Sequence, residues 1–369
     1  MTSAAPSEDP SRQPLLRAWT RIEALPTWVF IGWILTLLIL RTGLSWGGTG
    51  ELERFARNFP HPGTTFRSNS VLSPTIGWAT GIHTRTSWVL LHAGLSIGWF
   101  ALTAWLLKRR VGSVRAWRVG LVWLTFFAAP ASMLRRLGSY DVFTAIGVAL
   151  VALPVTPWPA LFGGAIMGAT NVEQGGIAVL CGALAFWAIP DAEGVHASLR
   201  KLASRFGAAL AGLLAGRILV LVWFHLVGAN VEGRSDAFTR LLLDSLRNAT
   251  SLGVTGVYAW LSVGWVIVIA TLWQLRAHPR YCVAAGIGLV AIPAAATIST
   301  LDGARVFGSV GGIALMLALL WFAQMATRRE GEWVLSCSAA LMLFGLLIPA
   351  VVTVYSGGIR VPWRFILSL

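Results

Sequence analysis

The chain is poor in charged residues for its length. Charged residues make up 12% of the 369 residues, hydrophobic residues make up 56%, and the mean hydropathy is +0.70. Soluble domains carry charge on about a quarter of their residues, so this composition argues against an ordinary soluble protein. The two longest polar stretches, 47–85 and 228–253, are too short to bury a core of their own. We therefore expect no soluble domain.

Cysteine and histidine are equally sparse. Cys181, Cys282 and Cys337 all lie in apolar segments and lack the spacing of metal ligands or of a disulfide framework. The histidines stand singly, without an H-x-x-x-H or H-E-x-x-H pattern, which argues against a zinc site. The sequence also has no glycine-rich phosphate loop, no Ser–His–Asp order and no haem motif. We predict no metal site and no cofactor, and the sequence leaves metal dependence open.

Long apolar segments are what the chain has in excess. At ~20 residues per span, the length accommodates about ten to twelve membrane helices. We identify about eleven segments: 27–45, 86–107, 119–134, 141–155, 157–170, 173–189, 207–227, 255–275, 282–299, 308–327 and 333–355. The fourth to sixth are short and interrupted by prolines and by Gly163–Gly164. The sequence thus predicts an all-α, polytopic membrane bundle of about eleven transmembrane helices.

The basic residues indicate the orientation of this bundle. Short cytoplasmic loops retain positive charge, and the compact basic groups fall on one side of the predicted topology: Lys108–Arg110, Arg200–Lys201 and Arg328–Arg329. On this basis residues 1–26 are a cytoplasmic tail, and 27–369 form a single transmembrane domain in the cell membrane, typical of a bacterial plasma membrane. The formal net charge of +14 is spread over helix ends, where arginine contacts lipid phosphates, so we exclude nucleic acid as a partner.

The polar gap after the first span carries acids and cations close together. Glu51 and Glu53 precede Arg54 and Arg57 in the run 51–57. A carboxylate at this place suits a general base that deprotonates an acceptor hydroxyl. The alternative is a solvated helix in which Glu53 pairs with Arg57 at helical i,i+4 spacing.

Two further gaps follow the third and fifth apolar segments. In the first, Arg135 and Arg136 precede Asp141, and adjacent arginines match the oxygens of a phosphate. In the second, Glu173 and Gln174 open a strongly apolar run, where an ionisable residue is a functional hypothesis by default. For both acids, stabilisation of a helix N-terminus is the alternative explanation.

The last gap reads Thr-Leu-Asp-Gly-Ala-Arg-Val-Phe-Gly between two long apolar spans. Asp302 and Arg305 are three residues apart, so both side chains fit one helical face. This compact pair is the most site-like element of the sequence. A purely structural salt bridge is the alternative.

Together these patches and the topology resemble polytopic glycosyltransferases of the GT-C class and related polysaccharide polymerases. The likeness rests on the acidic first outer loop, Gly-Ser-Tyr-Asp at 138–141, Asn-x-Glu-Gln at 171–174 and Asp-Gly-x-Arg-Val-Phe at 302–307. Such enzymes move a sugar from a polyprenyl-phosphate carrier to an acceptor on the outer face of the membrane. The resemblance implies Glu51 or Glu53 as the catalytic acid, with Arg135, Arg136 and Arg305 facing the carrier phosphate. The chain departs from the pattern in having no Asp-Asp pair in this loop and no soluble C-terminal domain.

The sequence therefore predicts a membrane glycosyltransferase that uses a polyprenyl-phosphate-linked donor and a glycan or lipid acceptor of the cell envelope. We expect Glu51, Glu53 and Asp302 to be catalytic. The predicted substrate-binding residues are Arg54, Arg57, Arg135, Arg136, Asp141, Glu173, Gln174 and Arg305. Two alternatives stay open: a transporter or flippase for an anionic lipid or small solute, and a non-catalytic subunit of an envelope assembly. Transport would need polar residues along a path at mid-depth, and these residues cluster at one face instead, apart from Arg217.

Overall fold

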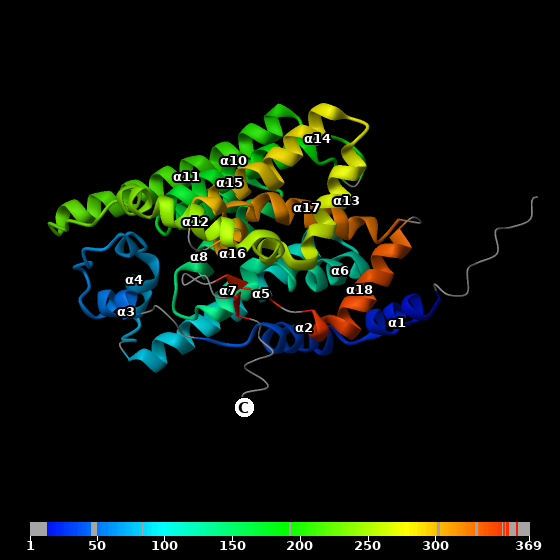
Figure 1. Cartoon of the computed structure of the whole chain (residues 1–369), viewed down its shortest axis with the longest axis horizontal. Helices are drawn as coiled ribbons and strands as arrows, with labels where there is room; N and C mark the ends of the chain where they lie inside the picture. Colours follow the sequence, from blue (N-terminus) through cyan, green and yellow to red (C-terminus); the bar gives the residue numbers. More distant parts are fainter. Residues whose placement is uncertain are drawn as a thin grey trace, which may run out of the picture.

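The computed structural model of the chain describes residues 13–45, 50–82, 84–191, 193–300, 303–328, 331–348, 350, 352–353 and 359–360. It is an elongated bundle of helices (Figure 1). The first half contains α1 Gln13–Ala24, α2 Thr27–Thr42, α3 Gly50–Arg57, η1 Phe66–Asn69, α4 Leu72–Ala79, α5 Arg85–Val111, α6 Val114–Leu124, α7 Ala128–Arg135, α8 Asp141–Ala152, α9 Pro157–Gly168 and α10 Val172–Ala188.

The second half contains α11 Leu199–Leu226, α12 Arg234–Leu261, η2 Ser262–Gly264, α13 Trp265–Leu275, α14 Pro279–Gly286, η3 Ile287–Ala291, α15 Ile292–Ile298, α16 Gly303–Val310, α17 Gly312–Met325, α18 Glu332–Phe344 and η5 Gly345–Leu347. Two short strands, β1 Val352–Thr353 and β2 Ile359–Arg360, pair antiparallel. Inside α12, Gly253 has a φ of +48°, which an L side chain rarely adopts, and the helix kinks there.

Helices make up most of each predicted apolar segment, although 333–355 also contains β1, and four helices are long and apolar enough to cross a membrane on their own. These are Arg85–Val111, Leu199–Leu226, Gly256–Leu275 and Pro279–Ile298. Three bent pairs raise the number to seven among the described residues, if each pair is one span. By length and composition the chain is a membrane protein, while the predicted count of eleven spans is not confirmed.

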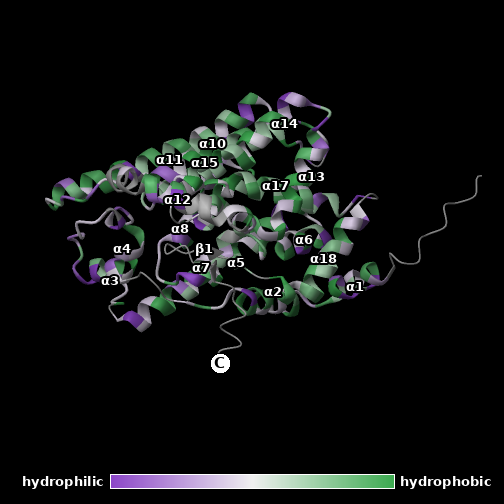
Figure 2. Cartoon of the chain, in the orientation of Figure 1, coloured by the Kyte–Doolittle hydropathy of each residue, from purple (hydrophilic) through white to green (hydrophobic). Residues whose placement is uncertain are grey.

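The surface of the bundle has the polarity expected in a bilayer. Hydrophilic residues gather toward the ends of the elongated bundle, and the helices between are largely hydrophobic (Figure 2). On α11, large apolar side chains are exposed: Leu210, Leu214, Ile218, Leu219, Leu221, Val222 and Leu226. In water such a face would be costly, whereas against lipid tails it needs no cover.

Helix α17 forms the centre of the core. Its residues from Gly312 to Ala323 are all buried, and it packs against α6, α8, α10 and α13. A helix that is apolar on every side is the kind that other helices surround. It therefore fixes where the ends of α6, α8 and α10 lie.

Helices α9 and α11 pack with their backbones in contact. Gly164 and Gly168 lie one turn apart on α9, and Gly212 and Gly216 do the same on α11. A Cβ at any of these four positions would overlap a backbone carbonyl of the other helix. Small residues at this spacing allow membrane helices to approach closely. The sequence suggests an interruption at Gly163–Gly164, but the chain stays helical there because the glycines serve packing.

The two ends of the bundle gather different loops. At one end, Arg115 Nε lies 3.1 Å from Glu23 Oε2, and buried Arg118 donates to the carbonyl oxygens of Ile22, Glu23 and Leu25. This fastens α1, which lies within the predicted 1–26 tail, to the basic segment 108–118. The small lobe of α3 and α4 lies at the other end (Figure 1). The predicted tail and the 108–118 basic cluster thus share one end, opposite the acidic first loop.

Candidate functional site

The turn at residues 138–141 presents a carboxylate at the start of α8. Gly138 has a φ of +99°, and Trp88 Nε1 donates to its carbonyl oxygen at 3.0 Å. Ser139 Oγ donates to Asp141 Oδ2 at 2.8 Å and accepts from the Asp141 backbone N–H at 3.3 Å. The positive end of the helix dipole further favours the ionised acid. Asp141 is thus held in one orientation.

Arg305 meets this carboxylate from α16. Its Nη1 lies 3.2 Å from Asp141 Oδ1 and 3.2 Å from the hydroxyl oxygen of Tyr140. The guanidinium carbon also lies 5.6 Å from the centre of the Tyr140 ring. The two charged side chains are 15% and 7% exposed, so the pair is largely desolvated and its attraction is little screened. Arg305 thus joins the second polar gap to the fourth.

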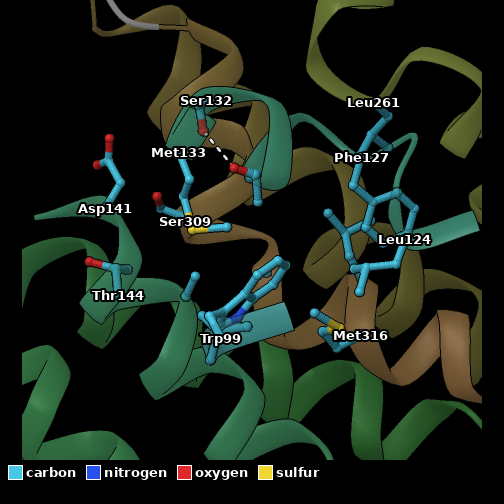
Figure 3. Close-up of a pocket in the computed structure, with 16 residues that line it drawn as sticks. Trp99, Leu124, Phe127, Ser132, Met133, Asp141, Thr144, Leu261, Ser309 and Met316 are labelled. Carbon is cyan, nitrogen blue, oxygen red and sulfur yellow. Dashed lines mark hydrogen bonds between the residues drawn. The ribbon is translucent and has the colours of Figure 1, made fainter. Parts of the chain in front are cut away.

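A narrow cavity opens beside this ion pair (Figure 3). Its volume is about 30 Å³, room for one or two water molecules, and Asp141 and Thr144 of α8 line one side of it. Ser132, Ser309 and Trp99 also line it, and the remaining wall is apolar. Thr144 Oγ1 and Trp99 Nε1 are buried and have no hydrogen-bond partner within the described residues. The polar residues of the cavity wall are therefore the indole of Trp99, the carboxylate of Asp141 and the hydroxyl residues Ser132, Thr144 and Ser309.

Helix α3 carries the two acids of the first loop. Glu53 is 7% exposed and accepts from Arg57 Nη2 one turn later, the i,i+4 pair expected from the sequence. Glu51 is more accessible, with 31% of its side chain exposed, and its Oε2 lies 3.5 Å from Arg67 Nη1. Of these two carboxylates, Glu51 is the one that solvent-borne groups reach.

The first loop packs on the Asp141 turn. Leu52 and Ala56 of α3 form one buried cluster with Trp88 and Tyr140. On the other side of α3, Phe55 is buried against α11. The acidic helix is therefore wedged between the turn that carries Asp141 and the end of α11.

The same loop reaches the third gap. Ser70 Oγ donates to the carbonyl oxygen of Thr170 at 2.6 Å, and Asn69 Nδ2 donates to that of Glu232 at 3.1 Å. Arg217, the cation that the sequence places inside a span, donates from Nη1 to Asn69 Oδ1 at 3.0 Å. All four polar gaps thus gather at one end of the bundle.

The remaining predicted site residues have varied surroundings. Arg135 Nε donates to the Thr42 carbonyl oxygen at 2.6 Å, and Arg54 Nε donates to that of Gly50 at 3.0 Å, so both have contacts that serve the local fold. Arg136 is half-buried at the end of α7.

At the start of α10, Asn171 Oδ1 accepts from the Gln174 backbone N–H at 3.4 Å, which makes Asn171 the capping residue of this helix. Glu173 is exposed and Gln174 is half-buried. Asp302 lies outside the described residues, so its predicted pairing with Arg305 stays a prediction.

Sequence reasoning missed several members of this region. Thr144 and Trp99 line the cavity, yet in the sequence they resemble ordinary apolar-segment residues. Tyr140, which contacts Arg305, belongs to the Gly-Ser-Tyr-Asp patch but was not predicted as a site residue. Arg67 was missed as the partner of Glu51. Thr144 lies three residues after Asp141, so the two side chains lie on the same face of α8. This spacing was the only sign in the sequence that Thr144 belongs to the site. In the described part of the chain, no group of three or more His, Cys, Asp or Glu residues is placed to hold a metal ion.

Comparisons with known proteins show a distant likeness to a solved structure. No protein-family model and no curated protein sequence matches the chain. Among solved structures it is similar to the Archaeoglobus fulgidus oligosaccharyltransferase, solved tethered to an acceptor peptide containing the NVT sequon. The identity is 13% and the TM-score 0.42, over 87% of this chain and 53% of the other. The chain thus spans about half the length of that protein, and a likeness of this size carries no argument about function.

Proposed function

We propose that this chain is a membrane glycosyltransferase. In this proposal it takes a sugar from a polyprenyl-phosphate-linked donor and transfers it to a glycan or lipid acceptor of the cell envelope. The reaction takes place at the bundle end that carries α3, on the outer face of the plasma membrane. One observation carries the proposal: a desolvated Asp141–Arg305–Tyr140 cluster lies beside the acid-bearing helix α3.

Removing such a charged cluster from water costs free energy. A carboxylate and a guanidinium removed from water are weak contributors to stability, because desolvation offsets most of their attraction. Ionisable groups at membrane depth instead accompany ion passage or chemistry on polar groups carried by lipids. The four gaps meet at one end, which favours chemistry at a membrane surface over a path through the bundle.

The transfer step assigns roles to the predicted residues. The bond between the sugar C1 and the donor phosphate oxygen breaks, and C1 bonds to the acceptor hydroxyl oxygen. The hydroxyl proton passes to a carboxylate, for which we propose Glu51, Glu53 or Asp302. Of Glu51 and Glu53, the two of these acids that the structure describes, Glu51 is the more exposed.

Negative charge builds on the leaving phosphate in this step, and arginine N–H groups stabilise it. We propose that Arg305 takes this role while Asp141 orients it. Arg54, Arg57, Arg135 and Arg136 flank the phosphate, and Glu173 and Gln174 contact polar groups of the substrates.

The test is transfer by the purified protein in sealed proteoliposomes with a panel of radiolabelled polyprenyl-phosphate sugars. We expect labelled acceptor to form, with a loss of ~100-fold or more when the general base is replaced. The variants are Glu51→Gln, Glu53→Gln and Asp302→Asn, and the matched control is Asp244→Asn, whose carboxylate is exposed on α12. Labelled lipid that crosses the bilayer intact, with no transfer for any donor, would contradict the proposal and favour the flippase alternative.

A further inference from the structure

A second and much larger cavity lies at the end of the bundle away from Asp141. Its volume is about 680 Å³, within the range of pockets that hold small-molecule or headgroup-sized ligands. The loop 189–198, the N-terminus of α11 and the C-terminal parts of α5 and α17 surround it. No residue of the proposed transfer site lines it, so it is independent of the proposed function.

The cavity is lined by more positive than negative charge. Four cationic side chains face it against two acidic ones: Arg110, Arg200, Lys201 and Arg205 against Asp191 and Glu193. One of the acids already serves its own loop, since Asp191 Oδ1 accepts the backbone N–H groups of Glu193 at 3.0 Å and Val195 at 2.9 Å. The excess of cationic over acidic side chains around the cavity is therefore part of the folded structure.

Two of the cations are built into the wall. Arg205 donates to the carbonyl oxygens of Val151, Ala152 and Pro154 at 2.5 to 2.7 Å. Carbonyls hold a guanidinium in place without cancelling its charge. Arg110 Nε is buried and has no hydrogen-bond partner in the part of the chain that the structure describes. An N–H donor left without an acceptor in this way costs free energy unless a ligand accepts from it.

The N-terminus of α11 adds to the positive potential. Ser198 Oγ caps the helix by accepting the Lys201 backbone N–H at 3.4 Å, and the first turn contains no acid. Instead Arg200 and Lys201 occupy that turn, where the helix dipole already disfavours cations. Repulsion of this kind is relieved when an anion binds between the helix end and the cations.

Part of the wall is apolar. Leu317, Leu320 and Trp321 of α17 line the cavity together with Phe186 and Val155. A ligand that fits both surfaces has a phosphate at one end and hydrocarbon at the other. We propose that this cavity binds the phosphodiester headgroup of an anionic membrane lipid.

The test compares phospholipids that differ in charge. The purified protein is titrated in neutral detergent with phosphatidylglycerol or phosphatidylcholine, and unfolding is followed by the fluorescence of its 19 tryptophans. A ligand that binds the folded state raises the unfolding midpoint. We expect phosphatidylglycerol to raise it and phosphatidylcholine to leave it unchanged. Inorganic phosphate forms a second arm, and an equal rise at millimolar phosphate would assign the site to a soluble anion and overturn the lipid source.

A charge-matched pair of variants locates the effect. The double variant Arg200→Gln, Lys201→Gln removes two exposed cations that line the cavity, and we expect roughly thirtyfold weaker phosphatidylglycerol binding. Lys108→Gln, Arg109→Gln removes two exposed cations next to Arg110 that do not line it. Wild-type affinity in this control supports the site. Equal losses in the two double variants, or an equal response to both phospholipids, would overturn the proposal.

Discussion

The buried arginines at the two ends of helix α8 have opposite surroundings, a carboxylate at one end and carbonyl oxygens at the other. At Asp141, where α8 begins, Arg305 faces a carboxylate at 3.2 Å, and the adjoining cavity holds about 30 Å³. Where α8 ends, Arg205 meets only carbonyl oxygens among its hydrogen-bond partners described here, and the adjoining cavity holds about 680 Å³. Twelve residues, or ~18 Å, separate these ends.

This difference indicates different roles for the two buried cations. A balanced pair such as Asp141–Arg305 has no net charge to attract an anion at rest, but its N–H groups can stabilise charge that develops during a reaction. An unbalanced group attracts an anion permanently. We therefore assign transient charge to the end that carries Asp141 and a resident anion to the end that carries Arg205.

The largest expected effect comes from forcing helices α9 and α11 apart. Gly212→Ala places a methyl group against the carbonyl oxygen of Leu161, so α9 and α11 move apart. We expect a loss of about 3 kcal/mol of stability, because overpacking at a backbone contact has no flexible side chain to yield. Thermal unfolding in detergent measures it. Gly207→Ala on the same helix has open space around its Cβ and should match wild type; equal loss in both variants would argue against the interlock.

The next effect tests whether the Asp141 end is balanced. Asp141→Asn strands the Arg305 charge, which is 15% exposed, and we expect a loss of about 2 kcal/mol, below the range for a fully buried pair. The unfolding midpoint of Asp141→Asn should fall, and the double variant Asp141→Asn, Arg305→Gln should recover most of it. Failure of the double variant to recover would mean that the pair is not the cause.

Arginine-to-lysine changes sharpen the comparison. Lysine keeps the charge and loses the planar fork. At Arg205 the fork serves three carbonyls, so Arg205→Lys should lower stability by about 1–2 kcal/mol and leave transfer intact. At Arg305 we expect the reverse, with transfer reduced about tenfold or more and the unfolding midpoint nearly unchanged. The same ranking of stability and transfer in both variants would remove the distinction between the two ends.

The smallest effect concerns pH at the Arg205 end. Burial lowers the pKa of His196 below its ordinary value, as do the nearby charges of His278 and Arg280. Its ring stacks on Tyr281, and the charged groups around it and the cavity are Arg110, Asp191, Glu193, Arg200, Lys201, Arg205, His278 and Arg280.

A bound phosphodiester stabilises the imidazolium of His196 and so raises its pKa, and binding then takes up protons. Affinity for phosphatidylglycerol should therefore rise as pH falls from 7.5 to 5.5, by no more than about fourfold. Titrations at the two pH values measure this, and His196→Asn should remove the dependence. If His278→Asn removes it instead, the assignment to His196 is wrong.

Much of the fold was predictable from the sequence, because hydropathy reports directly on helices that face lipid. Helices make up most of every predicted segment, and the i,i+4 pairing of Glu53 with Arg57 follows from local geometry. The number of spans did not follow in this way, since α8, α9 and α10 are too short for a simple length rule.

Long-range pairing could not be predicted. Asp141 and Arg305 were both singled out, but they are 164 residues apart in sequence, and local spacing favoured Asp302 as the partner. The basic cavity was hidden for another reason. Its cations fit the rule for orientation in the membrane so well that nothing in the sequence indicates a second role for them. The glycines of α9 carried the spacing of a packing face, but neighbouring prolines favoured an interruption.

The contact between α9 and α11 also restricts the routes by which lipid can enter. Hydrocarbon tails enter membrane proteins between neighbouring helices that side chains hold apart. Here backbone meets backbone along Gly164, Gly168, Gly212 and Gly216, and a tail has no seam to follow. Lipid cannot enter between α9 and α11, so in the proposed function the polyprenyl chain of the donor reaches the α3 end between other helices.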